Sequence, residues 1–118
     1  MTCREAMQTE FDFCLGEERL SDALEIMSAT GGDLVPVVES RDGMRCMGMV
    51  AAREAAVRLG LSDQRPSEVL CRELAAPPPA QAAPGEDATV ARERMRQAGM
   101  SSLPVIDGGK LVGMLTKN

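Results

Sequence analysis

The sequence predicts an α/β fold made of two copies of one unit. Residues 20–38 align with residues 88–106 at a constant offset of 68, and six of the 19 aligned positions are identical. Residues 44–51 then align with residues 109–116, with a glycine at the same place in both copies. Each copy contains a helical pattern, a short apolar run with a proline, a turn and a second apolar run. Helices that alternate with short buried strands are typical of an α/β architecture.

The helical pattern of each copy has a start and a stop signal. Apolar residues at helical spacing mark one face of the first helix: Leu20, Ala23, Leu24 and Met27. Ser21 and Thr89 are the predicted caps at the two helix starts. Gly31 and Gly99 are placed where each helix would end in a left-handed turn.

Two apolar runs follow each helix and predict a hairpin. Residues 34–38 and 103–106 are continuous apolar runs, as in strands that are buried on both faces. Residues 41–43 and 107–109 contain the glycines of hairpin turns. In the first copy a helix over residues 51–60 comes next, with Gly60 as its predicted stop.

A short helical segment precedes each copy, at residues 3–7 and 67–74. The first is followed by a predicted strand in which Phe11, Phe13 and Leu15 share a face. The corresponding segment of the second copy, residues 75–88, contains four prolines and predicts either an irregular edge strand or a linker. The second copy also lacks the last helix. We therefore expect a first repeat at residues 1–75 and a second at residues 76–118.

Composition narrows the functional classes. The chain has 118 residues, 44% of them hydrophobic, and a net charge of −5, which argues against non-specific binding of nucleic acid. It has no apolar segment near the length of a membrane span and no signal-peptide run at its start, so a cytoplasmic protein is expected. The four cysteines form no Cys-x-x-Cys pair, so the sequence predicts no metal site. The chain has no histidine, which excludes a Ser-His or Cys-His catalytic pair. We expect no enzymatic activity.

The order of these elements, present twice, resembles the cystathionine-β-synthase (CBS) domain family. The resemblance rests on the short helix ending at Met7, the helix with Ala and Met at Ala23 and Met27, the Pro-Val strand, and the Gly-h-h-Thr ending Gly113-Met114-Leu115-Thr116, where h is hydrophobic. It covers the whole chain and implies a tandem CBS pair, or Bateman module.

The resemblance also implies a function. Such pairs bind adenosyl ligands (AMP, ADP, ATP, S-adenosylmethionine or NAD) in clefts between the repeats and regulate an attached or separate effector protein. They commonly form homodimers through their helices and are not themselves catalytic.

Carried onto this sequence, the family's motif selects eight ligand-binding candidates: Thr9, Val35, Pro36, Glu54, Leu103, Pro104, Thr116 and Lys117. Thr116 would contact a phosphate at a helix start, with Lys117 as a charge partner. The ribose-binding acid of this copy would fall just after Asn118. In the first copy Ala51 replaces the hydroxyl, while Glu54 stands at the position of the ribose acid.

The remaining candidates have other roles. The apolar pairs Val35-Pro36 and Leu103-Pro104 would line the two clefts. Thr9, which follows the helix that ends at Met7, would add a polar contact. Because the sequence has no Trp or Tyr, adenine would rest on aliphatic side chains. Each of these residues also has a structural explanation: core packing for the apolar pairs, helix capping for Thr116 and a first-turn acid for Glu54. A ligand-free module for dimerisation or partner contact is therefore the alternative.

Overall fold

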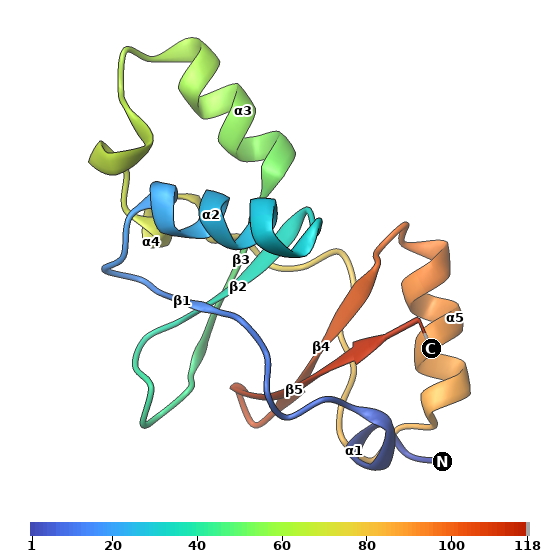
Figure 1. Ribbon diagram of the computed structural model, residues 1–118. Coiled ribbons are helices and arrows are strands. Elements are labelled where there is room, and N and C mark those ends of the chain that lie inside the picture. The colour runs from blue at the N-terminus through green and yellow to red at the C-terminus, as the bar shows by residue number, and fades with distance from the viewer. Residues whose placement is uncertain (118) are drawn as a thin grey trace. The chain divides into compact units, whose positions relative to one another are not determined.

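The computed structural model describes residues 1–117 and divides into two compact units (Figure 1). Unit 2 is Asp12–Pro77, and unit 1 combines Met1–Phe11 with the chain from Pro78 onward. Each unit combines helices with a small β-sheet, which confirms the predicted α/β class and its two copies.

Unit 2 is built around a three-stranded sheet in the order β1-β2-β3. Its elements are β1 (Cys14–Leu15), α2 (Leu20–Thr30), β2 (Leu34–Val38), β3 (Cys46–Ala51), α3 (Ala52–Leu61), the 3-10 helix η1 (Pro66–Glu68) and α4 (Cys71–Leu74). Strand β1 pairs with β2 in parallel, and β2 pairs with β3 in an antiparallel hairpin. The predicted apolar face of α2 packs on this sheet, because Leu20, Ala23 and Met27 are buried in the same cluster as Val35 and Val50.

Unit 1 repeats this plan in a smaller form. Its elements are α1 (Cys3–Ala6), α5 (Ala88–Gln97), β4 (Ser102–Asp107) and β5 (Lys110–Thr116). The hairpin of β4 and β5 is antiparallel, with a register shift after Val105 that matches the shift after Val37 in unit 2. In the proline-rich segment a single residue, Ala82, bridges to Val105 in parallel, at the place where β1 pairs in unit 2. Of the two predictions for this segment, an irregular edge strand agrees better with the structure than a linker.

The two leading helices are exchanged between the repeats. Helix α1 precedes the first repeat but packs in unit 1, where the Cys3 N–H donates to the Glu86 carbonyl at 2.8 Å. Helix α4 precedes the second repeat but packs in unit 2, where the Cys71 N–H donates to the Glu18 carbonyl at 2.8 Å. The compact units therefore differ from the repeats expected at 1–75 and 76–118 mainly at the start of the chain, because Met1–Phe11 packs with the residues from Pro78 onward. The boundary between repeats at residues 75 and 76 stays a prediction.

Several predicted details of the helices and the first strand are wrong. Helix α2 is capped by Arg19, one residue before its first helical residue, and the Asp22 carboxylate accepts the Arg19 N–H at 2.9 Å. Helix α5 is capped by Asp87, whose carboxylate accepts the Thr89 N–H at 3.0 Å. Ser21 and Thr89 therefore lie inside the first turns, because neighbouring acidic side chains hydrogen-bond to the free backbone N–H groups.

Two further boundaries differ from the predictions. Helix α3 continues past Gly60 to Leu61, and the Ser62 hydroxyl donates to the Arg58 carbonyl at 2.8 Å beyond its end. The first strand contains only Cys14 and Leu15, and Cys14 rather than a phenylalanine is its fully buried side chain. The left-handed conformations at Gly31 and Gly99 are confirmed, with φ angles of 75° and 70°.

Glu86 ties the proline-rich segment to α5 in unit 1. Its carboxylate accepts the Ala83 N–H at 2.8 Å and hydrogen bonds from Arg94 at 2.5 and 3.2 Å. The Arg94 guanidinium, followed by the Ala83 N–H, lowers the pKa of Glu86 below its ordinary value of 4.5. A lowered carboxyl pKa stabilises the folded state above pH 4.5, and this contribution is lost as the pH falls through the folded-state pKa.

We expect Glu86→Gln to lower the free energy of unfolding by about 1 kcal/mol at pH 7, because the pair is partly exposed to solvent. The difference from the unchanged protein should shrink as the pH falls below 4.5. Urea denaturation at pH 7 and at pH 3.5 measures both effects. Glu93→Gln is the control, since Glu93 pairs with Arg96 on the more exposed surface of α5. A difference that persists at low pH, or that Glu93→Gln matches, would contradict the assignment.

Candidate ligand-binding site

Strand β5 carries the Gly-h-h-Thr ending of the second copy. Thr116 is its last residue and pairs with Ser102, while Leu103 and Pro104 pair with the two residues before it. Leu103 and Pro104 are buried, so both are core residues of the hairpin whatever else they contact. Thr116 is half-buried, and Lys117 follows it as an exposed side chain.

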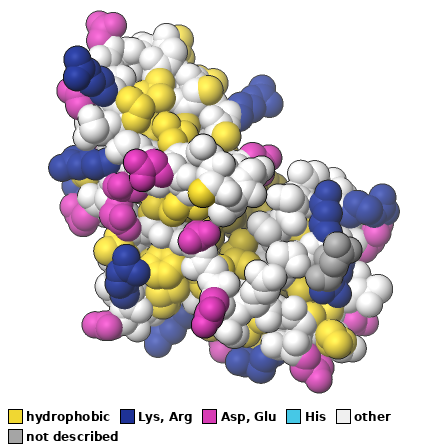
Figure 2. Space-filling view, in the orientation of Figure 1, with side chains coloured by type: hydrophobic (Ala, Val, Ile, Leu, Met, Phe, Trp, Pro, Cys, Tyr) yellow, Lys and Arg dark blue, Asp and Glu magenta, His cyan; other side chains and the backbone are white. Residues whose placement is uncertain are grey.

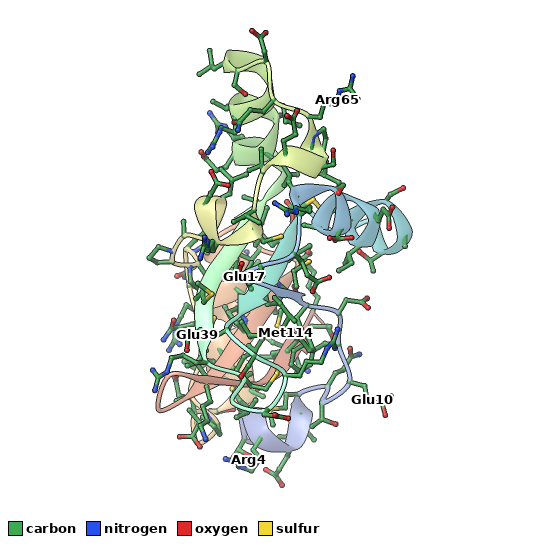
Figure 3. The ribbon with its side chains drawn as sticks, turned by 90° about the vertical axis from the view of Figure 1, so that its left-hand side faces the viewer. Arg4, Glu10, Glu17, Glu39, Arg65 and Met114 are labelled. Carbon is green, nitrogen blue, oxygen red and sulfur yellow. The ribbon has the colours of Figure 1, made fainter. Side chains whose placement is uncertain are left out.

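The exchanged N-terminal segment adds Thr9 to the same unit. Gln8 and Met114 form an isolated antiparallel bridge, in which the Gln8 N–H donates to the Met114 carbonyl at 2.8 Å and the Met114 N–H donates to the Gln8 carbonyl at 3.0 Å. Figure 3 labels Met114, which precedes Thr116 by two residues on β5. Thr9 is exposed and directly follows the bridged residue, so the structure places it with Thr116 and Lys117 in unit 1.

Arg92 is a residue of this region that the sequence analysis did not select. From α5, its Nε donates to the Thr116 carbonyl at 3.0 Å, which places a guanidinium at the end of β5. The repeat alignment could have drawn attention to Arg92, because this charged residue aligns with Leu24 of the first copy. Leu24 packs against the core cluster of unit 2, so a charged residue at this position departs from the pattern of the repeat. We call Thr9, Arg92, Thr116 and Lys117 the unit 1 polar set.

Unit 2 holds the other three candidates, Val35, Pro36 and Glu54. Val35 and Pro36 are buried in β2, as their counterparts are in β4. Glu54 is exposed in the first turn of α3, where an acidic side chain interacts favourably with the helix dipole. Ala51 is the N-cap residue of this helix and has no hydroxyl, so its side chain accepts no hydrogen bond from the N–H groups of the first turn.

The same positions of the two units therefore differ in chemistry. Thr116 corresponds to Ala51, and Thr9 corresponds to the exposed Pro77 at the repeat offset of 68. The same backbone bridge occurs in both units: Ala76 pairs with Met49 in unit 2, and Gln8 pairs with Met114 in unit 1. Unit 1 has two hydroxyls at these positions and unit 2 has none, so unit 1 is the better equipped of the two for a phosphate.

Other kinds of site have little support in residues 1–117. This part of the chain contains no group of three or more Cys, Asp or Glu side chains that could hold a metal ion. None of its helices is long and apolar enough to cross a membrane. Basic and acidic side chains are interspersed on the face shown in Figure 2.

The comparisons with known proteins agree with this architecture. The CBS domain family model matches the chain twice, over residues 3–59 and 71–118. No protein with a curated description matches it. Among solved structures, AcuB from Vibrio cholerae, named for acetoin utilization, has a TM-score of 0.84 and 22% identity, over 98% of this chain and 84% of its own.

Some of the similar structures were solved with adenosyl ligands. CBSX2, in complex with AMP, has a TM-score of 0.75 and 21% identity, over 98% of this chain and 90% of its own. The CBS domain pair of protein MJ0100, in complex with methylthioadenosine and S-adenosyl-L-methionine, has a TM-score of 0.69 and 16% identity, over 99% of this chain and 90% of its own. These identities show a shared fold, and the family matches cover both repeats. The chain belongs to the CBS-domain family.

Proposed function

We propose that this chain is a regulatory module that binds an adenine nucleotide, AMP, ADP or ATP, through unit 1. The observation that carries the proposal is the unit 1 polar set, which combines two hydroxyls with two cationic side chains in one unit. Support also comes from CBSX2, a protein of the same fold that was solved with AMP. The module is not catalytic in this proposal and acts in the cytoplasm on a separate or attached effector.

The chemistry of the polar set suits a phosphate group. Hydroxyls and guanidinium N–H groups donate hydrogen bonds to phosphate oxygens, and a guanidinium can do so with two bonds at once. Arg92 uses Nε for the Thr116 carbonyl, and its two terminal amino groups have no partner among the described residues. Lys117 would add a second positive charge nearby. The adenine would rest on aliphatic surface, since the chain has no Trp or Tyr.

The positive charges also favour a nucleotide over S-adenosylmethionine, the second ligand class considered. The sulfonium of S-adenosylmethionine carries a positive charge where a nucleotide carries a negatively charged phosphate. With Arg92 and Lys117 in unit 1, like charges would oppose it. We therefore expect S-adenosylmethionine to bind more weakly than AMP or ATP.

We expect a nucleotide at 100 times its Kd to stabilise the folded chain by about 2.7 kcal/mol, because it binds the native state and not the unfolded one. For a domain of this size the melting temperature should rise by on the order of 10 °C. A thermal-shift series with AMP, ADP, ATP, S-adenosylmethionine and NAD measures this directly.

Adenosine and ribose 5-phosphate are the controls for this series, since each carries one half of the recognised groups. Smaller shifts with both than with AMP would support joint recognition of base and phosphate. If none of the five ligands shifts the melting temperature, the sensor proposal is wrong.

A second candidate function is a ligand-free module for dimerisation. The observation in its favour is that unit 2 has no hydroxyl at either position, while α3 exposes Val57 at 48% and Leu61 at 85%. Exposed apolar side chains on one helix suit a contact with a second copy or with an effector protein. A homodimer by sedimentation, together with no ligand response, would favour this candidate over the first.

A further inference from the structure

We propose that Cys14 and Cys71 form a disulfide bond inside unit 2 when the protein meets an oxidising low-molecular-weight disulfide. The bond would join β1 to α4, and so fix the exchanged leading helix of the second repeat to the sheet of the first. It is independent of whether unit 1 binds a nucleotide.

The backbone brings the two cysteines together. Helix α4 lies against β1, and backbone hydrogen bonds from Cys71 and Arg72 hold it to the turn that follows this strand. The Cys71 N–H donates to the Glu18 carbonyl at 2.8 Å, and the Arg72 N–H donates to the Gly16 carbonyl at 3.1 Å. Gly16 lies two residues after Cys14, so the first turn of α4 is held beside the end of β1. An ion pair between Arg72 and Glu17, which is labelled in Figure 3, joins the same two segments at 3.0 Å.

The side chains meet in the same place. Cys14 and Cys71 are both fully buried and belong to one hydrophobic cluster of unit 2. Both are free thiols, and each shifts the pKa of the other, as neighbouring groups do. The Cys71 thiol also lies 3.3 Å from the Arg19 carbonyl. Two buried thiols in one cluster, on segments that hydrogen-bond to each other, are the arrangement from which a disulfide can form.

The two thiols influence each other's acidity. The interaction with Cys71, followed by burial, raises the pKa of Cys14, while the interaction with Cys14 lowers the pKa of Cys71 against the effect of burial. The thiolate is the attacking species in thiol–disulfide exchange. In this proposal Cys71 attacks and Cys14 resolves the mixed disulfide.

Unit 1 provides an internal comparison. At the repeat offset of 68, Cys71 corresponds to Cys3 and Cys14 corresponds to Ala82. Cys3 occupies the same place in α1 and is fully buried, but burial raises its pKa and no cysteine stands opposite it. The fold thus forms with a Cys–Ala pair in one unit and a Cys–Cys pair in the other, so packing does not require the second cysteine.

The reaction balances with glutathione disulfide as the oxidant. Local opening of the four-residue helix α4 admits it, and the Cys71 thiolate attacks one of its sulfur atoms. One glutathione leaves as a thiolate, which takes up a proton. The Cys14 sulfur then gives up its proton and attacks the Cys71 sulfur of the mixed disulfide, which releases the second glutathione. Two protein thiols are oxidised to one disulfide, and one glutathione disulfide is reduced to two thiols.

The test uses a Cys3→Ala, Cys46→Ala double variant, which leaves only the proposed pair. After incubation with glutathione disulfide, the protein is denatured, alkylated and weighed by mass spectrometry. We expect no alkylation, a mass two hydrogens below the reduced form, and a peptide that links Cys14 to Cys71. The oxidised form should also melt at a higher temperature, and dithiothreitol should reverse the change.

A matched control adds Cys14→Ala, which reproduces the Cys–Ala pair of unit 1. This variant has no resolving thiol, so Cys71 should keep one glutathione after oxidation, and the melting temperature should not rise. If the double variant does not fold, the same mapping on the unchanged chain should show a loss of two of its four thiols. In the protein that retains both Cys14 and Cys71, two alkylated cysteines after oxidation, a stable glutathione adduct, or a link only between chains would each overturn the proposal.

Discussion

Replacing Gly48 with alanine is expected to destabilise the protein by about 2–5 kcal/mol, which is a large part of the stability of a domain this size. A Cβ atom at Gly48 would lie 2.6 Å from the Ala76 carbonyl oxygen and 2.8 Å from the Ala76 nitrogen. These are backbone atoms of the exchanged segment and cannot rotate away. Gly48 also has a φ angle of 129°, a conformation that residues with a side chain rarely adopt.

The matched control is Gly60→Ala. Gly60 lies inside α3, and a Cβ added there would meet nothing within 4 Å. Alanine at this position should stabilise the protein by about 0.5–1 kcal/mol, because glycine is a weaker helix former. Urea or thermal denaturation of the two variants measures both changes. Equal stability of Gly48→Ala and the unchanged protein would show that the backbone at Ala76 does not approach β3 closely enough to exclude a side chain at Gly48.

This role of the glycine could not be read from its motif. The Gly-h-h-Thr pattern predicted a phosphate contact at Thr116 and gave its glycine no role of its own, whereas the structure gives Gly48 and Gly113 a packing role. A Cβ at Gly113 would lie 2.7 Å from the Met7 Cγ and 3.0 Å from the Gln8 carbonyl oxygen. In each unit the glycine makes room for the leading segment of the other repeat.

Local patterns predicted the elements well because helices and hairpins depend on neighbouring residues. The apolar spacing of residues 20–27, the left-handed glycines at 31 and 99 and the two hairpins are all confirmed. The helix starts at Arg19 and Asp87 were missed, because several residues near a helix start can supply a cap and only the three-dimensional geometry selects one.

Contacts between distant segments could not be predicted. The exchange of α1 and α4 depends on hydrogen bonds such as the one between Gln8 and Met114, and no local pattern records such a pairing. For the same reason the assignment of Thr9 to unit 1 and the position of Arg92 at Thr116 needed the structure. The repeat alignment held part of this information, because Arg92 stands where the first copy has a leucine.

The second large effect is expected at Thr116. We expect Thr116→Val to weaken AMP binding by about 10- to 100-fold, which corresponds to the loss of one hydrogen bond to a charged phosphate, about 1.5–3 kcal/mol. Valine has the shape of threonine and favours a strand, so β5 and its pairing with Ser102 should be retained. Isothermal titration calorimetry with AMP and with adenosine measures the change. The affinity for adenosine should be nearly unaffected, since adenosine has no phosphate.

Two further variants separate binding from folding. Thr89→Val removes a hydroxyl from the exposed surface of α5 in the same unit and should leave AMP affinity unchanged. Arg92→Leu introduces the residue that the first copy has at this position, and it should weaken AMP more than adenosine because it removes a positive charge. If Thr116→Val weakens AMP and adenosine equally, Thr116 does not contact the phosphate. If neither Thr116→Val nor Arg92→Leu changes AMP affinity while AMP still stabilises the protein, the nucleotide binds elsewhere than at the unit 1 polar set.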